Sequence, residues 1–213
     1  MSNVLFDALF ADHIGSEAPF LILPDGDVWS YQLFLETAAQ YAHVLEALGL
    51  EVGDRLAVQV QKSPEALATY AACLQAGVIF LPLNTAYTAR EMAYFIENSG
   101  AKLVLCDAKA ETALRPVAQA AQAQLQVLNR DGSGGFTELA MQHPKSFQTR
   151  ARSGNDLAAF LYTSGTTGRS KGAMLSHDNL LSNAKTLCEA WRFTAQDVLL
   201  HALPIFHTHG LFV

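Results

Sequence analysis

A run of glycines and hydroxyl side chains that ends in a lysine stands out at residues 163–172, Thr-Ser-Gly-Thr-Thr-Gly-Arg-Ser-Lys-Gly. Glycine lets the backbone approach a ligand closely, because no Cβ blocks it. Successive amides and hydroxyls can donate hydrogen bonds to phosphate oxygens, and the lysine adds a positive charge. The run therefore predicts a binding loop for a triphosphate. The predicted phosphate-binding residues are Thr163, Ser164, Gly165, Thr166, Thr167, Gly168 and Lys171.

The segments on either side of this loop indicate which kind of phosphate site it forms. A Walker P-loop, GxxxxGK[ST], places its lysine at the start of a helix. Here the lysine is followed by a short apolar segment, 172–176, and the loop is preceded by another, 157–162, and both are typical of strands. We therefore expect the loop to join two strands, which disfavours a Walker NTPase. The alternative is a Gly/Ser/Thr surface linker, but linkers rarely place a single lysine between two apolar strands.

At these residues the sequence resembles the phosphate-loop motif of the acyl-adenylate-forming family, which includes acyl-CoA synthetases, luciferases and nonribosomal peptide adenylation domains. Residues 74–84, Leu-Gln-Ala-Gly-Val-Ile-Phe-Leu-Pro-Leu-Asn, resemble the family's early helix-to-strand motif. Residues 203–210, Leu-Pro-Ile-Phe-His-Thr-His-Gly, resemble the segment whose histidine or aromatic residue borders the acyl pocket. The resemblance extends from about Leu21 to Val213. Within the family, residues 83–87 and 206–212 are most similar to malonyl-CoA synthetases.

The resemblance implies a two-step reaction with ATP, Mg²⁺ and coenzyme A. A carboxylate attacks the α-phosphorus of ATP, pyrophosphate leaves, and the sulfur of coenzyme A then displaces AMP. The loop from Thr163 to Lys171 would hold the β- and γ-phosphates, with Mg²⁺ sharing their charge. His207 would lie beside the acyl carboxylate and the approach path of the thiol, as the predicted catalytic residue. The alternatives are a structural histidine in a turn, His209 in the same role, or a zinc pair of the two, for which no further ligands are suitably spaced.

Composition narrows the class of protein. Half of the 213 residues are hydrophobic, which argues against disorder. The formal charge of −6 and the lack of a basic run argue against nucleic acid as a partner. The sequence has no signal-peptide pattern and no apolar run near the roughly 18 residues that span a bilayer, so we expect a cytoplasmic enzyme without a membrane span. The three cysteines, Cys73, Cys106 and Cys188, are expected to be reduced core thiols without a metal.

Helix and strand signals alternate along the chain. Pro64 after Ser63 marks a helix start, and Thr88 with Glu91 forms a capping box. For the helix after the phosphate loop, Ser176, Asp178 and Asn179 are the candidate caps. Such alternation predicts an α/β fold of βαβ units, with largely parallel sheets covered by helices. The expected strands include 19–24, 28–31, 55–60, 79–83, 102–107, 125–128 and 157–162.

The pattern changes once, at a flexible turn over 131–135 and a polar connector over 143–155. We expect residues 1–150 to form the first α/β layer of an adenylation domain. Residues 151–213 would then begin the second layer, which carries the phosphate-binding loop. In the family, later segments supply adenine and ribose contacts, a magnesium-binding glutamate, a hinge and a mobile C-terminal domain with a catalytic lysine. We therefore expect an N-terminal fragment that is inactive alone.

The function expected for the parent protein is that of an AMP-forming acid–CoA ligase for malonate or methylmalonate. One alternative is a synthetase for a medium-chain, aryl or amino acid. A pocket cation for the distal carboxylate, preferably arginine, would separate the two, and we expect it beyond Val213. A non-catalytic ATP-binding scaffold is the third possibility.

Overall fold

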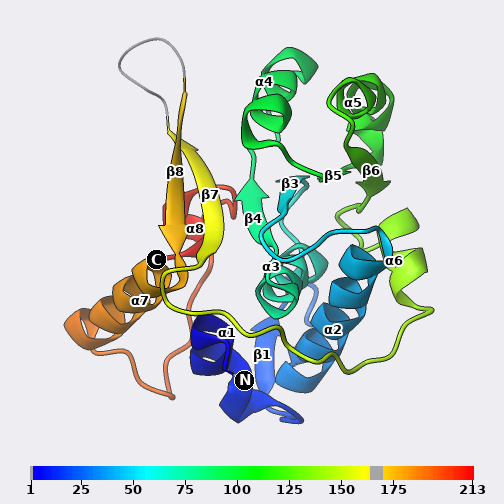
Figure 1. Cartoon of the computed structure of the whole chain (residues 1–213). Coiled ribbons are helices and arrows are strands. Elements are labelled where there is room, and N and C mark those ends of the chain that lie inside the picture. The colour runs from blue at the N-terminus through cyan, green and yellow to red at the C-terminus, as the bar shows by residue number, and fades with distance from the viewer. Residues whose placement is uncertain (1, 164–169) are drawn as a thin grey trace.

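The computed structural model describes residues 2–163 and 170–213 and contains a six-stranded sheet of order β6-β5-β3-β4-β7-β8 (Figure 1). Neighbouring strands are parallel except β7 and β8, which are antiparallel. A separate hairpin pairs β1 with β2. The expected α/β fold with a largely parallel sheet is confirmed. The strands are β1 Pro19–Ile22, β2 Val28–Ser30, β3 Arg55–Gln59, β4 Ile79–Pro82, β5 Leu103–Cys106, β6 Gln124–Val127, β7 Leu157–Thr163 and β8 Lys171–Ser176.

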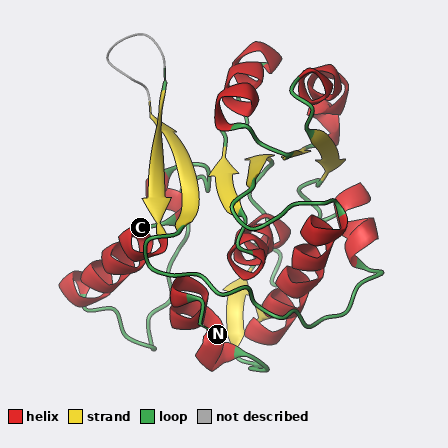
Figure 2. Cartoon of the chain, viewed as in Figure 1, coloured by secondary structure: helices red, strands yellow, loops and turns green. Residues whose placement is uncertain are grey.

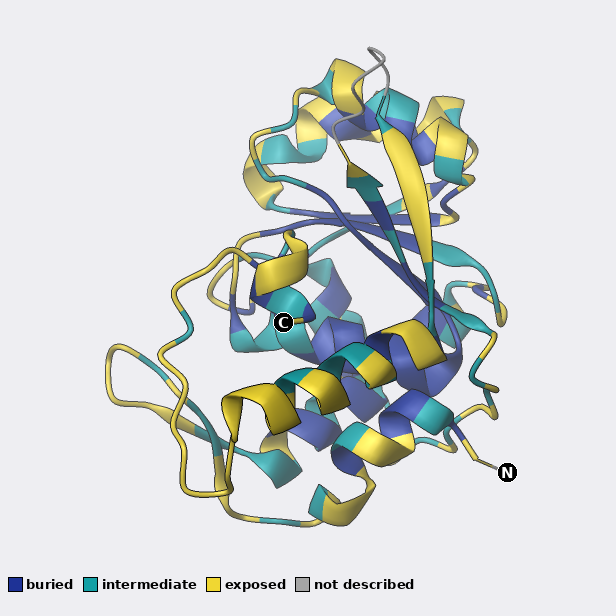
Figure 3. Cartoon of the chain, turned by 90° about the vertical axis from the view of Figure 1, so that its left-hand side faces the viewer, coloured by how far each residue is buried: buried dark blue, intermediate teal, exposed yellow. Residues whose placement is uncertain are grey.

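Helices cover both faces of the sheet (Figure 2). The helices α4 and α5 pack on one face, and α1, α2 and α3 pack on the other. All residues of β4 and β5 are buried, as Figure 3 shows for the middle of the molecule, because each strand has a hydrophobic layer on both sides. Among the described residues, no helix has the length and apolar character needed to cross a bilayer. The helices are α1 Val4–Phe10, the 3₁₀ helix η1 Ala11–His13, α2 Tyr31–Ala47, α3 Pro64–Ala76, α4 Ala89–Ser99, α5 Ala108–Ala120, α6 Gly135–Ala140, α7 His177–Trp191 and α8 Thr208–Leu211.

Local capping signals define the helices that follow β3 and β4. The Ser63 hydroxyl accepts a hydrogen bond from the Ala66 amide at 3.1 Å, ahead of α3. Thr88 and Glu91 form the predicted capping box of α4. Such a cap typically stabilises a protein by about 1 kcal/mol. Gly77 ends α3 with a φ of 71°, and a Cβ there would lie 3.2 Å from Val52, so glycine suits this turn for two reasons.

The antiparallel pair β7–β8 confirms that strands flank the predicted phosphate loop. Ser176 is the cap of α7, in a capping box with Asn179. The loop residues 164–169 lie outside the described residues. In β7, Ala159 pairs with Phe80 of β4, so this strand extends the sheet built by the first part of the chain. The division into layers at residue 150 stays a prediction.

The prediction that the three cysteines are core thiols has a mixed outcome. Cys73 and Cys106 are buried, as predicted, but Cys188 is exposed, so its prediction as a core thiol was wrong. Its neighbour on α7, Trp191, is 55% exposed and meets only the edge of Phe193 among described aromatic rings. All residues of α7 after Leu180 are partly or fully exposed.

His177 occupies a polar junction between α7 and the segment before β7. Its side chain is 1% exposed, and its Nδ1 has no hydrogen-bond partner among the described residues. Burial, helped by the nearby Arg152 guanidinium, lowers the pKa of His177. The carboxylates of Asp156 and Asp178 act against this shift, and Asp156 also forms an ion pair with Arg152 at 3.2 Å.

We expect His177 to make the protein less stable as the pH falls below about 6.5, the ordinary pKa of histidine. In this range the unfolded chain takes up a proton that buried His177 does not, which lowers the free energy of unfolding by at most about 1.4 kcal/mol per pH unit. Above this range both states are neutral and the contribution is constant. Urea unfolding between about pH 5 and 8 should show a steeper acid loss for the wild type than for His177→Gln.

His209→Gln is the control, because His209 is exposed. It should keep the wild-type pH dependence. Equal slopes for the wild type and His177→Gln would contradict a neutral buried histidine.

Candidate functional site

The parallel strands β3, β4 and β7 end at one edge of the sheet, at Gln59, Pro82 and Thr163. The connection after β3 leads to α3 on one face, and the connection after β4 leads to α4 on the other. In open α/β sheets, ligands bind in the crevice that such diverging connections leave at the carboxyl ends of the strands. This edge is therefore the candidate site.

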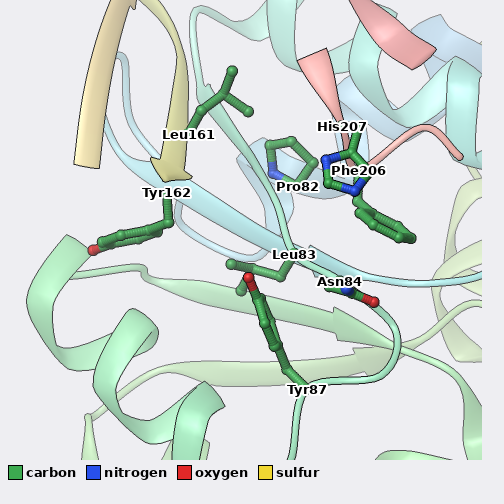
Figure 4. A pocket seen from close by; sticks show the side chains of 8 residues that line it. All are labelled: Pro82, Leu83, Asn84, Tyr87, Leu161, Tyr162, Phe206 and His207. Atoms are coloured by element: carbon green, nitrogen blue, oxygen red, sulfur yellow. The ribbon is translucent and has the colours of Figure 1, made fainter. Parts of the chain in front are cut away.

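A pocket lies at this edge (Figure 4). Three parts of the chain meet there: the end of β4 with the turn that follows it, the end of β7, and the segment before α8. Its volume of about 40 Å³ is far below the roughly 300 Å³ or more of a typical small-molecule site, so these residues form one wall of a site. The residues that line it are Pro82, Leu83, Asn84, Tyr87, Leu161, Tyr162, Phe206 and His207.

His207, the predicted catalytic residue, is in this pocket. It precedes the first turn of α8, and its exposed ring lies beside the Phe206 ring, with 4.8 Å between the centroids. His209 is not among the lining residues. The structure thus brings the first of the two histidines to the pocket, which agrees with the position implied by the family motif, while its catalytic role stays a prediction.

The segment that carries His207 is held against the loop after β3. Lys62 donates hydrogen bonds from Nζ to the carbonyl oxygens of His201 and Leu203, at 2.9 and 3.1 Å. Farther along, Ile205 and Phe212 are buried in the core that contains α3. His207 is therefore positioned by contacts on both sides of it in the sequence.

Two of the seven predicted phosphate-binding residues are described by the structure. Thr163 and Lys171 face each other across the β7–β8 pair, and the Thr163 hydroxyl lies 3.4 Å from the Lys171 carbonyl oxygen. The Lys171 side chain is exposed and forms no ion pair with the described residues. Thr163 directly follows Tyr162 of the pocket, so the phosphate-loop hairpin begins at the pocket wall. The other predicted residues, Ser164, Gly165, Thr166, Thr167 and Gly168, lie outside the described residues.

Two tyrosine hydroxyls join helix α4 to this hairpin, one from α4 and one from β7, and neither tyrosine was predicted to have a role. The Tyr94 hydroxyl donates to the Ser170 carbonyl at 2.9 Å, next to Lys171. The Tyr162 hydroxyl donates to Asn98 Oδ1 at 2.6 Å. Burial raises the pKa of Tyr162 to about 12, so its hydroxyl remains a donor at neutral pH. A tyrosine or asparagine at these places has no sequence signature of its own, because its partner lies about 70 residues away.

The turn after β4 supplies the other polar groups of the wall. Asn84 and Tyr87 fall within the stretch 83–87 that resembles malonyl-CoA synthetases, although no role was predicted for them. The Tyr87 ring packs on Phe95 of α4 with centroids 4.8 Å apart, and burial raises the pKa of its hydroxyl. As predicted, Glu91 serves as a helix cap.

The described residues contain no cluster of three or more His, Cys, Asp or Glu side chains arranged to hold a metal ion. Mg²⁺ in nucleotide sites is usually held by substrate phosphates with one or two carboxylates. We therefore assign no residue of the described chain to Mg²⁺.

Comparison with known proteins decides the family. The profile of the family described as AMP-binding enzyme matches residues 11–213. The chain belongs to this family. It superposes on crystal structures of MatB from Rhodopseudomonas palustris, apo and ATP-bound, with TM-scores of 0.95 and 0.94, at 48% and 49% identity, covering 100% of this chain and 42% of MatB.

The chain is also similar to two curated relatives. A malonate–CoA ligase of Arabidopsis thaliana is 27% identical over 98% of this chain and 37% of its own length. A feruloyl-CoA synthase of an Amycolatopsis species is 33% identical over 87% of this chain and 36% of its own length. The chain thus spans about two fifths of the length of the proteins it matches.

Proposed function

We propose that this chain works within an AMP-forming acid–CoA ligase, which joins malonate or methylmalonate to coenzyme A through an acyl-adenylate. The observation that carries the proposal is that His207 and the strand leading into the phosphate loop line one pocket. Adenylation needs a carboxylate and a triphosphate to be held side by side, and here β7 connects the two binding regions directly. The family membership and the likeness to ATP-bound MatB support ATP as the nucleotide.

The reacting groups are both anions, so the protein has to offset their repulsion and align them. Lys171 would supply positive charge to the β- and γ-phosphates, together with the backbone amides and hydroxyls of the loop. The lining residues include no carboxylate, so nothing on the described wall repels the acid. His207 would sit beside the carboxylate and, in the second step, beside the incoming thiol. When bound, Mg²⁺ would share the phosphate charge.

Malonate is supported by the Arabidopsis malonate–CoA ligase and by the resemblance of residues 83–87 and 206–212 to malonyl-CoA synthetases. The feruloyl-CoA synthase favours a second candidate, a ligase for an aryl acid. The described wall contains Tyr87, Tyr162 and Phe206 but no arginine or lysine, so it would also suit an aromatic ring. The cytoplasmic location expected from the sequence stays a prediction.

Acid-dependent ATP–pyrophosphate exchange by the complete ligase tests this proposal. With malonate, acetate, hexanoate, benzoate and ferulate as separate substrates, we expect the fastest exchange with malonate. Fastest exchange with benzoate or ferulate would keep the reaction and replace the acid. No exchange with any acid would favour a non-catalytic ATP-binding scaffold.

Lys171→Ala should reduce kcat/KM of the complete ligase by roughly 10- to 100-fold, the effect of one hydrogen bond to a charged group. Its side chain is exposed, so the melting temperature should stay close to that of the wild type. Lys185→Ala, an exposed lysine on α7, is the matched control and should keep wild-type activity. Unchanged turnover in Lys171→Ala would contradict the phosphate role.

His207→Ala should slow adenylation or thioester formation, while His209→Ala should slow neither, because only His207 lines the pocket. Single-turnover measurements separate the two steps: formation of the acyl-adenylate without coenzyme A, and its consumption after coenzyme A is added. If both steps keep wild-type rates in His207→Ala, this histidine has no part in the site. A loss of one to two orders of magnitude would be typical of a positioned acid–base or polar group.

A further inference from the structure

The side chain of Gln59 joins the two connections that diverge at the candidate site. Gln59 is the last residue of β3 and is 4% exposed. Its Nε2 donates to the carbonyl oxygens of Asn84 and Tyr87, at 3.0 and 2.9 Å. Because both partners are carbonyl oxygens, only the NH₂ end of the amide can face them. The orientation of this amide is therefore determined by its surroundings.

The two acceptors are the first and last residues of the turn after β4. Within the turn, the Tyr87 amide donates to the Asn84 carbonyl at 3.0 Å, and the Ala86 amide donates to Asn84 Oδ1 at 2.9 Å. These bonds close a tight turn of the kind that asparagine favours. They fix the shape of the turn but leave its position relative to the sheet open. Gln59 helps to fix that position, together with the packing of Tyr87 on Phe95, because it binds both ends of the turn to a central strand.

The same turn presents side chains to the pocket. Asn84 and Tyr87 line it together with His207, as Figure 4 shows. A shift of the turn would therefore move the wall that faces the acid. The phosphate-loop hairpin would be less affected, because Thr163 and Lys171 are held by β7–β8 pairing and Ser170 by Tyr94.

We propose that Gln59 is a positioning residue for the acid-binding wall: through the Asn84 and Tyr87 carbonyls it holds the turn whose side chains contact the acid. The proposal deepens the proposed function and rests on it. Gln59 acts on affinity for the acid, whereas ATP is bound by a separate part of the site. No motif in the sequence marks this residue, since its partners are backbone atoms 25 and 28 residues away.

Two variants of the complete ligase test the role. Gln59→Met keeps the size of the side chain and removes both donors. It should raise KM for the acid by about tenfold, the effect expected from losing about one net hydrogen bond, and should leave KM for ATP within about twofold of the wild type. A merely structural role would change both constants together or neither. Gln75→Met, at a buried glutamine on α3 outside the pocket, is the matched control and should keep both KM values.

Gln59→Glu adds a readout that depends on protonation. When the introduced side chain is ionised, its carboxylate faces two carbonyl oxygens and has no proton to donate. When it is protonated, its neutral carboxyl group can donate one hydrogen bond. The KM of Gln59→Glu for the acid substrate, divided by the wild-type KM at the same pH, should therefore decrease as the pH falls. The same ratio for Gln59→Met should not decrease. A constant ratio for Gln59→Glu across the pH range would overturn the hydrogen-bond role.

Hydrogen exchange at the amides of residues 84–88 makes the outcome independent of turnover. Faster exchange there in Gln59→Met, with unchanged exchange in β3, is expected. If the wild type shows no pyrophosphate exchange with any acid, the proposed function fails. Hydrogen exchange at the amides of residues 84–88 then still tests whether Gln59 positions the turn. Unchanged protection of residues 84–88 in Gln59→Met would overturn it, as would equal changes in KM for acid and ATP in an active enzyme.

Discussion

The structure depends on the parallel pairing of β3 with β4 at the centre of the sheet. Parallel strands place their carboxyl ends at the same edge of the sheet. Because buried backbone groups must be paired, the register from Arg55–Ile79 to Val58–Pro82 leaves the two strand ends little freedom to shift relative to each other. The chain leaves these two ends toward opposite faces. Each residue of the candidate site is within a few positions of a strand end at this edge, or belongs to a segment attached to it.

Helix α4 connects the two halves of the site. Phe95 contacts Tyr87 of the pocket turn on one side and Tyr162 of β7 on the other, with centroid distances of 4.8 and 4.5 Å. Tyr94 reaches the Ser170 carbonyl beside Lys171. Aromatic contacts of this kind contribute roughly 0.5–1.5 kcal/mol each beyond the area they bury. The wall that would face the acid and the hairpin that would face the phosphates therefore share one support.

Much of this arrangement follows from local sequence signals. Ser63 with Pro64, the Thr88–Glu91 box and Ser176 act within one helical turn, so the sequence alone predicts the helix starts they produce. The strands were predicted from short apolar runs, which explains why their ends differ from the observed ones by a residue or two. His207 was predicted by resemblance to a family motif rather than by any local rule.

Contacts between distant segments could not be predicted in the same way. The order of strands in the sheet, the bond from Tyr94 to Ser170 and the role of Gln59 all join parts of the chain whose sequences carry no mark of each other. For Cys188 the error is of another kind, because burial was predicted and the structure does not show it. Its apolar spacing on α7 suggested burial, but burial depends on what packs against a helix face, and among the described residues little does.

The distribution of charge is informative about the site because it runs against the composition. The chain has 20 acidic and 14 basic residues, yet no aspartate or glutamate lines the pocket. The polar groups there are an amide, two phenols and an imidazole, which can donate hydrogen bonds without repelling an anion. Lys171 carries a positive charge on the hairpin that begins at the same wall. This edge of the sheet therefore lacks the negative charge that dominates the composition, as the proposed placement of a carboxylate beside a triphosphate requires.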